Sequence, residues 1–232
     1  MTKQVKSKQR VAEHGEVFTA EREVKAMCDL VGQETDRIDS RFLEPACGDG
    51  NFLAEILNRK LQSSQMKRYR RSAYDWERNS LLALGSLYGV DLLLDNCIAC
   101  RERLYKIWHT EYKKVCKKEC NDETRASAKF ILELNIVCGN ALTLMCVDEN
   151  AQDSDEPIVF SEWSFPRNDA FIYRKDYTFD ELVNAEEKPK KKTKDDQLTL
   201  FDSEQVASND GGKFIQEYKC HYRLLGKSDK VE

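Results

Sequence analysis

Short apolar runs alternate with longer stretches of helical spacing over the first 145 residues of the chain. The short runs predict strands at 41–44, 88–91 and 135–138. Between them, apolar residues three and four positions apart predict helices at 51–61, 80–87, 94–107 and 124–134. Strands that alternate with helices favour a parallel sheet built from strand–helix–strand units, so the pattern predicts an α/β fold.

Two segments stand apart from this alternation. Residues 10–32 predict an N-terminal arm and a helix, on which Val24, Met27, Leu30 and Val31 recur at helical spacing. The polar stretch 62–78 interrupts the pattern, and we interpret it as an insertion.

The pattern changes at Pro157. Two predicted strands, 158–165 and 170–173, are joined by a turn at 166–169, and a short helix follows at 178–184. Residues 186–213 are charged and poor in apolar side chains, so we expect disorder there, whereas 214–225 resembles a strand. The predicted units are therefore a main domain at 1–150, a β-hairpin extension at 151–185, a charged tail at 186–213 and a strand-like segment at 214–232.

Composition and charge narrow the class of protein. Of the 232 residues 34% are charged, and no apolar run approaches the roughly 20 residues that span a membrane, so we expect no membrane contact. The first residues lack the apolar stretch of a signal peptide, and the chain has nine cysteines. Together these features indicate a reducing compartment, so we expect a cytoplasmic location.

The charge distribution bears on nucleic-acid binding. A net charge of −4 argues against a protein that wraps nucleic acid by itself. The basic clusters 67–71 and 113–118 are interpreted as solvated surface, and contact with DNA or an acidic partner stays open for them.

The most informative segment is 42–53, which reads Phe-Leu-Glu-Pro-Ala-Cys-Gly-Asp-Gly-Asn-Phe-Leu. An apolar strand ends at an acidic residue and a proline, two glycines flank Asp49, and an apolar helix begins. Glycines suit a turn in which a ligand lies within contact distance of the backbone, because a Cβ atom would clash there. The segment therefore predicts a ligand loop between a strand and a helix.

Four fragments, in order, resemble the motifs of S-adenosylmethionine-dependent methyltransferases, in particular the bacterial DNA adenine-N6 methyltransferases of restriction-modification systems. They are 15–20, where Ala20 replaces the usual proline; 44–50; 88–91; and 137–142, where Asn140 replaces the usual aspartate. The resemblance implies a Rossmann-like doubly wound sheet and S-adenosyl-L-methionine as cofactor. It implies cofactor contacts from Phe18, Thr19, Glu44, Pro45, Ala46, Cys47, Gly48, Asp49, Gly50, Asp91, Leu92, Asn140 and Ala141.

The resemblance also assigns parts of the cofactor to individual residues. Thr19 and 44–50 would hold the methionine end, Asp91 would accept hydrogen bonds from the ribose hydroxyls, and Asn140 would contact the adenine.

The family's acceptor motif, Asn/Asp-Pro-Pro-Tyr/Phe, is missing. The chain has four prolines, at positions 45, 157, 166 and 189, and no two are adjacent. In this family the motif accepts protons from the adenine amine and stacks on the flipped base. We therefore identify no catalytic residue, and we expect a partner polypeptide to supply the acceptor site and the recognition of duplex DNA. Phe160, Trp163, Phe165 and Phe171 of the predicted hairpin could form part of the interface.

Two alternative roles stay open for the chain. It could be a degenerate or non-catalytic scaffold subunit, or a methyltransferase that acts on a substrate other than DNA. Methyltransferase activity is therefore expected only with a partner.

Two further patterns bear on metal binding and on partners. The spacing of Cys97, Cys100, Cys116 and Cys120 can hold zinc, but a helical context favours structural cysteines, so we predict no metal site.

In the charged tail, the segment 197–201 resembles the short peptide that docks on the bacterial sliding clamp. Its docking residues would be Gln197, Leu198, Leu200 and Phe201.

Overall fold

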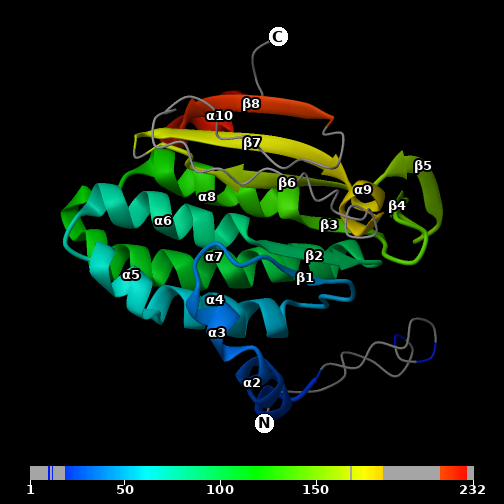
Figure 1. Ribbon diagram of the computed structural model, residues 1–232. Helices are drawn as coiled ribbons and strands as arrows, with labels where there is room; N and C mark the ends of the chain where they lie inside the picture. Colours follow the sequence, from blue (N-terminus) through cyan, green and yellow to red (C-terminus); the bar gives the residue numbers. More distant parts are fainter. Residues whose placement is uncertain (1–9, 11, 13–18, 168, 185–214, 229–232) are drawn as a thin grey trace, which may run out of the picture.

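A five-stranded mixed sheet lies at the centre of the structure (Figure 1). The computed structural model describes residues 10, 12, 19–167, 169–184 and 215–228. The strands of this sheet follow one another in chain order: β1 (Phe42–Glu44), β2 (Leu87–Asp91), β3 (Ile136–Asn140), β4 (Met145–Val147) and β5 (Asp153–Pro157). The pairs β1–β2 and β2–β3 are parallel, whereas β3–β4 and β4–β5 are antiparallel. The predicted α/β class is confirmed, but the sheet is mixed and not wholly parallel.

Helices connect the parallel strands. β1 leads through α4 (Asn51–Gln62), α5 (Ser64–Tyr69) and α6 (Ala73–Gly85) to β2. β2 leads through α7 (Leu94–Cys116), η1 (Lys117–Glu119) and α8 (Asp122–Asn135) to β3. α7 runs beyond the predicted end at 107 because Leu104, Trp108, Tyr112 and Cys116 continue its buried face at four-residue spacing.

The stretch 62–78, interpreted from the sequence as an insertion, is helical and packs into the core. This stretch forms α5 and the first turns of α6, and its Met66, Trp76 and Glu77 side chains are buried. Serine side chains cap both helices: Ser63 accepts a hydrogen bond from Met66 N, and Ser72 accepts one from Asp75 N. The polar composition hid these helices because several of the polar groups serve as caps or have partners in the interior.

A second, antiparallel sheet consists of β6 (Val159–Ser164), β7 (Phe171–Thr178) and β8 (Gln216–His221). It lies over α6 and α8 (Figure 1). α9 (Phe179–Asn184) follows β7, and η3 (Tyr222–Leu224) and α10 (Leu225–Ser228) follow β8.

The hairpin belongs largely to the chain's own core. Phe160 and Trp163 are buried, so the expectation that they form an interface with another polypeptide is wrong. Phe160 packs with Tyr88 and Val90 on one face of β2, whereas Trp163 joins the main core cluster. Side chains of β2 alternate between faces, and both faces of this strand are therefore covered.

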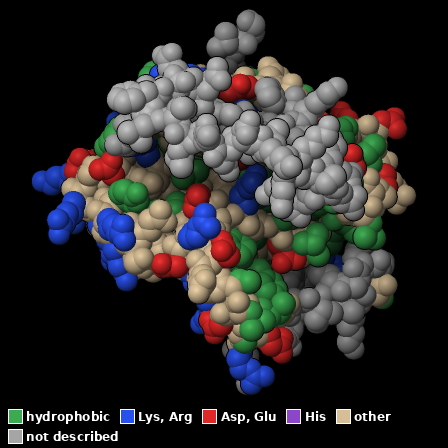
Figure 2. Space-filling model, in the orientation of Figure 1, with side chains coloured by type: hydrophobic (Ala, Val, Ile, Leu, Met, Phe, Trp, Pro, Cys, Tyr) green, Lys and Arg blue, Asp and Glu red, His purple; other side chains and the backbone are tan. Residues whose placement is uncertain are grey.

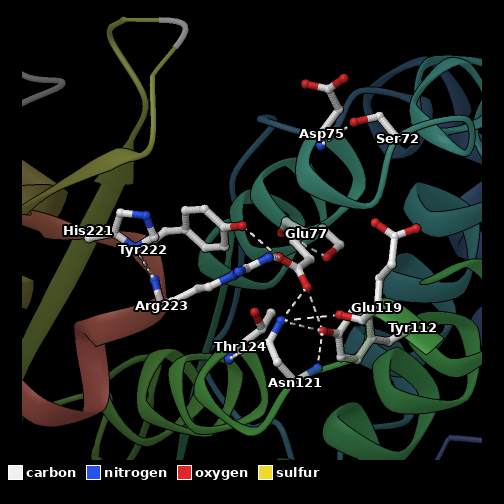
Figure 3. A network of polar contacts seen from close by, with 11 residues as sticks. Ser72, Asp75, Glu77, Tyr112, Glu119, Asn121, Thr124, His221, Tyr222 and Arg223 are labelled. Atoms are coloured by element: carbon white, nitrogen blue, oxygen red, sulfur yellow. Dashed lines mark hydrogen bonds and ion pairs between the residues drawn. The ribbon is translucent and has the colours of Figure 1, made fainter. Parts of the chain in front are cut away.

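Glu77 of α6 is the centre of a buried polar cluster (Figure 3). Its Oε1 atom accepts hydrogen bonds from Tyr112 OH at 2.5 Å and Asn121 Nδ2 at 2.8 Å. Its Oε2 atom accepts from Tyr222 OH at 2.6 Å and from Arg223 Nη2 at 2.6 Å. The guanidinium and the hydrogen bonds offset the cost of burying the carboxylate. The cluster ties the segment after β8 to α6 and α7.

The tyrosines of this cluster are hydrogen-bond donors at neutral pH. Burial, together with the hydrogen bond to Glu77, raises the pKa of Tyr112 and of Tyr222 above the ordinary value for tyrosine. Both hydroxyls therefore keep their protons and point them at the carboxylate.

Lys60 of α4 fixes the chain that enters β1. Its side chain is fully buried, and Nζ donates hydrogen bonds to Arg37 O at 3.1 Å, Ile38 O at 2.9 Å and Ser86 Oγ at 2.8 Å, as well as to Ser40 O. Burial lowers the pKa of Lys60 to about 7.

The N-terminal helices α2 (Glu21–Leu30) and α3 (Gly32–Asp36) precede β1. On α2, Val24 and Cys28 are buried, whereas Met27 and Leu30 are exposed, as is Val31 just beyond the helix. Three of the four apolar residues of the predicted helical pattern are therefore largely exposed within the described part of the chain.

Several predictions concern residues outside the described part of the chain. These are Phe18, the charged tail at 186–213, and the clamp-docking residues Gln197, Leu198, Leu200 and Phe201. They stay predictions. Among the described residues, no helix combines the length and the apolar character that crossing a membrane requires.

Glu77→Ala should lower the free energy of unfolding by about 3 kcal/mol, because it leaves Arg223 and the two tyrosine hydroxyls without their shared acceptor. Urea denaturation would measure the change. Glu119→Ala, which removes an exposed carboxylate in η1, is the matched control and should change stability by less than about 0.5 kcal/mol. Equal losses in the two variants would contradict a special role for Glu77.

The low pKa of Lys60 makes stability depend on pH. Between a folded-state pKa of about 7 and the ordinary 10.5, the unfolded chain binds more protons, so this residue makes the wild type more stable as pH rises. Lys60→Met lacks this contribution. The stability difference between wild type and variant should therefore grow from pH 7 to higher pH in urea titrations. A constant difference would mean that the surrounding carbonyl groups keep Lys60 charged.

Candidate functional site

A pocket of about 570 Å³ opens at the carboxyl ends of β1, β2 and β3. Figure 1 shows these ends on one side of the central sheet. Ten of the predicted cofactor residues line the pocket: Thr19, Glu44, Pro45, Ala46, Cys47, Gly48, Asp91, Leu92, Asn140 and Ala141. They come from four segments of the chain, and the parallel pairing of the strands brings them together. Ligands of open α/β sheets bind at such an edge.

The glycine loop forms a tight turn between β1 and α4. Cys47 N donates to Val90 O at 2.8 Å, which joins the loop to β2, and Gly50 N donates back to Cys47 O at 2.8 Å. Gly48 and Gly50 have φ angles of 51° and 87°, in the left-handed region that glycine adopts without strain. Gly50 is also the N-cap of α4 and offers no side chain to the free N–H groups of the first turn. These N–H groups make the start of α4 suitable for an anionic group of a ligand.

Asp91 at the end of β2 holds the site together. Its Oδ2 atom accepts a hydrogen bond from Gly48 N at 2.9 Å, and its Oδ1 atom accepts from Leu93 N at 2.9 Å and Asn96 Nδ2 at 3.0 Å. One carboxylate thus fixes the glycine loop, the end of β2 and the start of α7. Oδ2 accepts only one of these bonds and keeps a lone pair for a further donor.

Glu44 at the end of β1 is a second carboxyl group of the pocket. Its side chain is half-buried, and this burial raises the pKa of Glu44, while a hydrogen bond from the Ala46 backbone partly opposes the rise. No described residue forms an ion pair with Glu44, and a half-buried carboxylate of this kind gains from a cationic ligand group, because the cation would compensate its lost hydration.

Asn140 at the end of β3 is engaged within its own loop. Its Oδ1 atom accepts a hydrogen bond from Leu142 N at 3.0 Å, and its Nδ2 group donates to Asp153 Oδ1 at 3.0 Å. The amide therefore orders the turn that forms one rim of the pocket. Leu142 at this rim is almost fully exposed and offers an apolar surface.

Asp49 and Gly50 do not line the pocket, although both belong to the predicted set. Asp49 turns toward α7, where its Oδ2 atom lies 2.7 Å from Arg103 Nη2. The same guanidinium donates to Asn51 Oδ1. Asp49 and Gly50 therefore form the side of the loop that faces α7, where Arg103 and Cys100 lie against them.

Sequence reasoning missed part of the pocket lining: Asn51, Phe52, Leu93, Asn96, Gly139 and Leu142. Most of these residues lie within two positions of predicted ones. Asn96 is further away, in the first turn of α7, where it donates a hydrogen bond to Asp91. Asn96 Oδ1 also accepts from Arg10 Nη2 at 3.3 Å, so a residue of the N-terminal arm lies close to this site. A polar residue in the first turn of the helix after β2 is the signal that could have identified it.

Cysteines pack beneath the glycine loop. A hydrogen bond with Cys100, together with burial, raises the pKa of Cys47, so this thiol stays protonated. A hydrogen bond with Cys138 and burial raise the pKa of Cys97 in the same way, and the Cys138 pKa is lowered by that contact. Cys47 and Cys97 therefore act as small interior side chains.

Zinc was the alternative interpretation for these cysteines. Cys97 and Cys100 are fully buried in α7 and face the loop and β3, away from Cys120 at the far end of this helix. Within the described ranges, no group of three or more His, Cys, Asp or Glu side chains is placed to hold a metal ion.

The basic clusters lie away from the pocket. Lys67 and Arg68 belong to α5, and Lys113 and Lys114 to the last turn of α7. Figure 2 shows Lys and Arg side chains gathered at the left of the molecule, where Figure 1 has α5, whereas β1 to β3 end toward the right. A nucleic acid bound over the pocket would not rest on these clusters.

Comparisons of the chain with protein-family models, with curated proteins and with solved structures give no match. The motifs and the geometry of the pocket are therefore the features that point to a function.

Gly50→Ala should lower the free energy of unfolding by about 2 kcal/mol or more, because a Cβ atom adds strain in the left-handed region. The atom would also lie 2.7 Å from Cys100 Sγ. Gly32→Ala is the matched control, since nothing lies within 4 Å of its added Cβ. Urea denaturation of both variants tests the loop geometry, and a neutral Gly50→Ala would contradict it.

Proposed function

We propose that this chain is the S-adenosylmethionine-binding portion of a DNA adenine-N6 methyltransferase of the restriction-modification type, which acts with a partner polypeptide. The observation that carries the proposal is the convergence of the motif fragments. Thr19, the loop 44–48, Asp91 and Asn140 are distant in sequence but line one pocket. Each fragment thus lies where the resemblance requires it for contact with one shared ligand.

The order of the strands supports the proposal. In a doubly wound sheet the strands run from the third through the second to the first, and the fourth then follows on the other side of the first. The order β3-β2-β1 agrees with the first half of such a sheet. We infer that the chain contributes this half.

The residues present fit the cofactor. A pocket of about 570 Å³ is within the usual range for ligand sites. Glu44 would hold the ammonium group of the methionine end, and the N–H groups at the start of α4 would hold its carboxylate. Asp91 would accept from the ribose hydroxyls through its remaining lone pair, and Leu142 would cover the adenine.

The cofactor supplies a methyl group on a sulfonium centre, and this chain binds and orients it. Methyl transfer to adenine would also require groups that hold the adenine amine and accept a proton from it. In the family, an Asn-Pro-Pro-Tyr motif provides the groups that accept this proton and stack on the flipped base. The sequence of this chain has no such motif. We therefore assign the acceptor site to the partner.

DNA recognition is assigned to the partner as well. The net charge is −4, and the basic clusters in α5 and at the end of α7 lie at the opposite end of the sheet from the pocket. Binding of duplex DNA over the pocket needs cationic groups that another polypeptide would bring.

A second candidate function is a non-catalytic cofactor-binding subunit of the same kind of complex. The observation in its favour is Asn140, whose amide is hydrogen-bonded to Leu142 N and to Asp153. This amide is uncharged, so its hydrogen bond to the adenine would be weaker than that of the usual aspartate. Weak cofactor binding without methyl transfer in the reconstituted complex would support this alternative.

Titration calorimetry of the purified chain with S-adenosylmethionine and S-adenosylhomocysteine tests the proposal. We expect micromolar binding of both, and a loss of about tenfold or more in Asp91→Asn, because one charged hydrogen bond contributes about 1.5–3 kcal/mol. Asp122→Asn, an exposed carboxylate in the first turn of α8, should bind like the wild type. Circular dichroism checks that each variant is folded.

Two results would contradict the proposal. The first is a folded wild-type chain that binds neither compound, alone or with its partner. The second is unchanged affinity in Asp91→Asn, which would show that the pocket has another ligand.

A further inference from the structure

The strand β1 has a free edge. Phe42 N donates to Ser86 O at 2.9 Å, so Phe42 and Glu44 direct their peptide groups to β2. Peptide groups alternate along a strand, and those of Leu43 therefore point to the opposite edge. No strand among the described residues pairs with β1 there.

Apolar side chains surround this edge. A hollow of about 170 Å³ lies between α2, β1 and α4, and all but one of its lining residues are apolar: Met27, Cys28, Val31, Phe42, Leu43, Glu44, Phe52, Leu53 and Ile56. Met27 is 52% exposed and Leu43 is 43% exposed. Figure 2 shows hydrophobic side chains gathered in the lower half of this face, where Figure 1 has α2 and α4.

A second hollow lies toward the other face of the sheet. It has a volume of about 480 Å³ and extends from Arg41 before β1, past Tyr88 of β2, to Trp163 and Phe165 near the end of β6. Charged side chains also line it, and it lies beside the start of β1. A strand laid along the edge of β1 would direct every second side chain toward the apolar hollow between α2 and α4.

We propose that the free edge of β1 receives an apolar strand of the partner polypeptide, which runs parallel to β1. The inference rests on the proposed function and names the surface on which the partner docks. Unpaired peptide groups select a strand, and the apolar hollow between α2 and α4 selects apolar side chains on one face of that strand. The parallel direction follows from β1 to β3, since strands of a parallel sheet are normally paired and covered on both sides.

This arrangement would bring the partner's acceptor groups to the pocket. Glu44 lines both the hollow beside β1 and the pocket at the end of the strands. A parallel strand in the hollow therefore has its carboxyl end next to Glu44. A loop that follows this strand would lie over the pocket, on the side opposite to Asp91 and Asn140.

A second copy of this chain is a poorer occupant of the edge. Two-fold symmetry would pair β1 with its copy in the antiparallel direction and would set the two pockets at opposite ends. A second copy would also bring no acceptor motif to the pocket, since no two prolines of the sequence are adjacent.

Cross-linking in the native host tests the docking surface. The full chain carries an affinity tag, and photoreactive benzoylphenylalanine replaces Leu43. After irradiation, mass spectrometry identifies the cross-linked polypeptide and the cross-linked residues. We expect a polypeptide with an Asn-Pro-Pro-Tyr or Asn-Pro-Pro-Phe motif, joined to position 43 through residues just before that motif.

Substitutions at the surface provide the second measurement. Leu43→Arg and Met27→Arg should each lower the recovery of this polypeptide about tenfold, because a charge replaces a buried apolar contact. Ile98→Arg is the matched control, since Ile98 is 45% exposed on α7 and lines neither hollow beside β1. The control should recover the partner like the wild type.

The inference is overturned if position 43 cross-links to a second copy or to its own chain. It is also overturned if no polypeptide with the motif is recovered, or if Leu43→Arg and Met27→Arg leave the recovery unchanged. Calorimetry with S-adenosylmethionine separates the two proposals, because Leu43 does not line the pocket and Leu43→Arg should keep wild-type affinity. Cofactor binding without docking at β1 refutes only the surface, whereas docking without cofactor binding refutes only the function.

Discussion

The buried carboxylate of Glu77 is the contact on which the arrangement of the two sheets depends. It collects donors from α7, from the loop before α8 and from the segment after β8, all in one interior position. A charge in the interior is tolerated only when it is neutralised and hydrogen-bonded. The donors to Glu77 therefore stabilise the fold as a group, because the loss of one leaves the buried carboxylate less well compensated. The helices that carry the pocket are thereby held against the second sheet.

The pocket depends in the same way on one carboxylate. Asp91 joins the glycine loop to the end of β2 and the start of α7. The sequence predicted that Asp91 contacts a ligand, and the structure shows that Asp91 also holds the walls of the pocket together. Such a double role couples ligand affinity to the order of the loop, because a ligand that bonds to Asp91 also stabilises the turn at Gly48.

The edge of β1 that no described strand covers would give the proposed two-chain enzyme a physical basis. In a doubly wound sheet the ligand crevice lies where the strand order reverses, and strands on both sides of that point form it. In the proposed enzyme, the order β1-β2-β3 would supply one side of such a crevice, with the pocket at its end. Separate chains for donor and acceptor sites would then make methyl transfer conditional on assembly.

Local chemistry made the core of the site predictable from the sequence. The strand at Phe42, the turn at Gly48 and Gly50 and the helix that follows are specified by neighbouring residues, because positive φ angles and helix starts are short-range properties. Other features required the tertiary structure. The helical stretch 64–79 was hidden because Glu77 finds partners far along the chain, and Asp49 faces Arg103 because of packing against α7.

The sequence by itself thus determined the alternation of strands and helices, the glycine loop and most of the residues at the pocket. Only the tertiary structure decided which apolar residues are covered. Met27 and Val31 have the helical spacing of core residues, yet they lie exposed beside the unpaired edge of β1. Spacing reports which residues share a face, whereas burial depends on what packs against that face, and this is a property of the whole assembly.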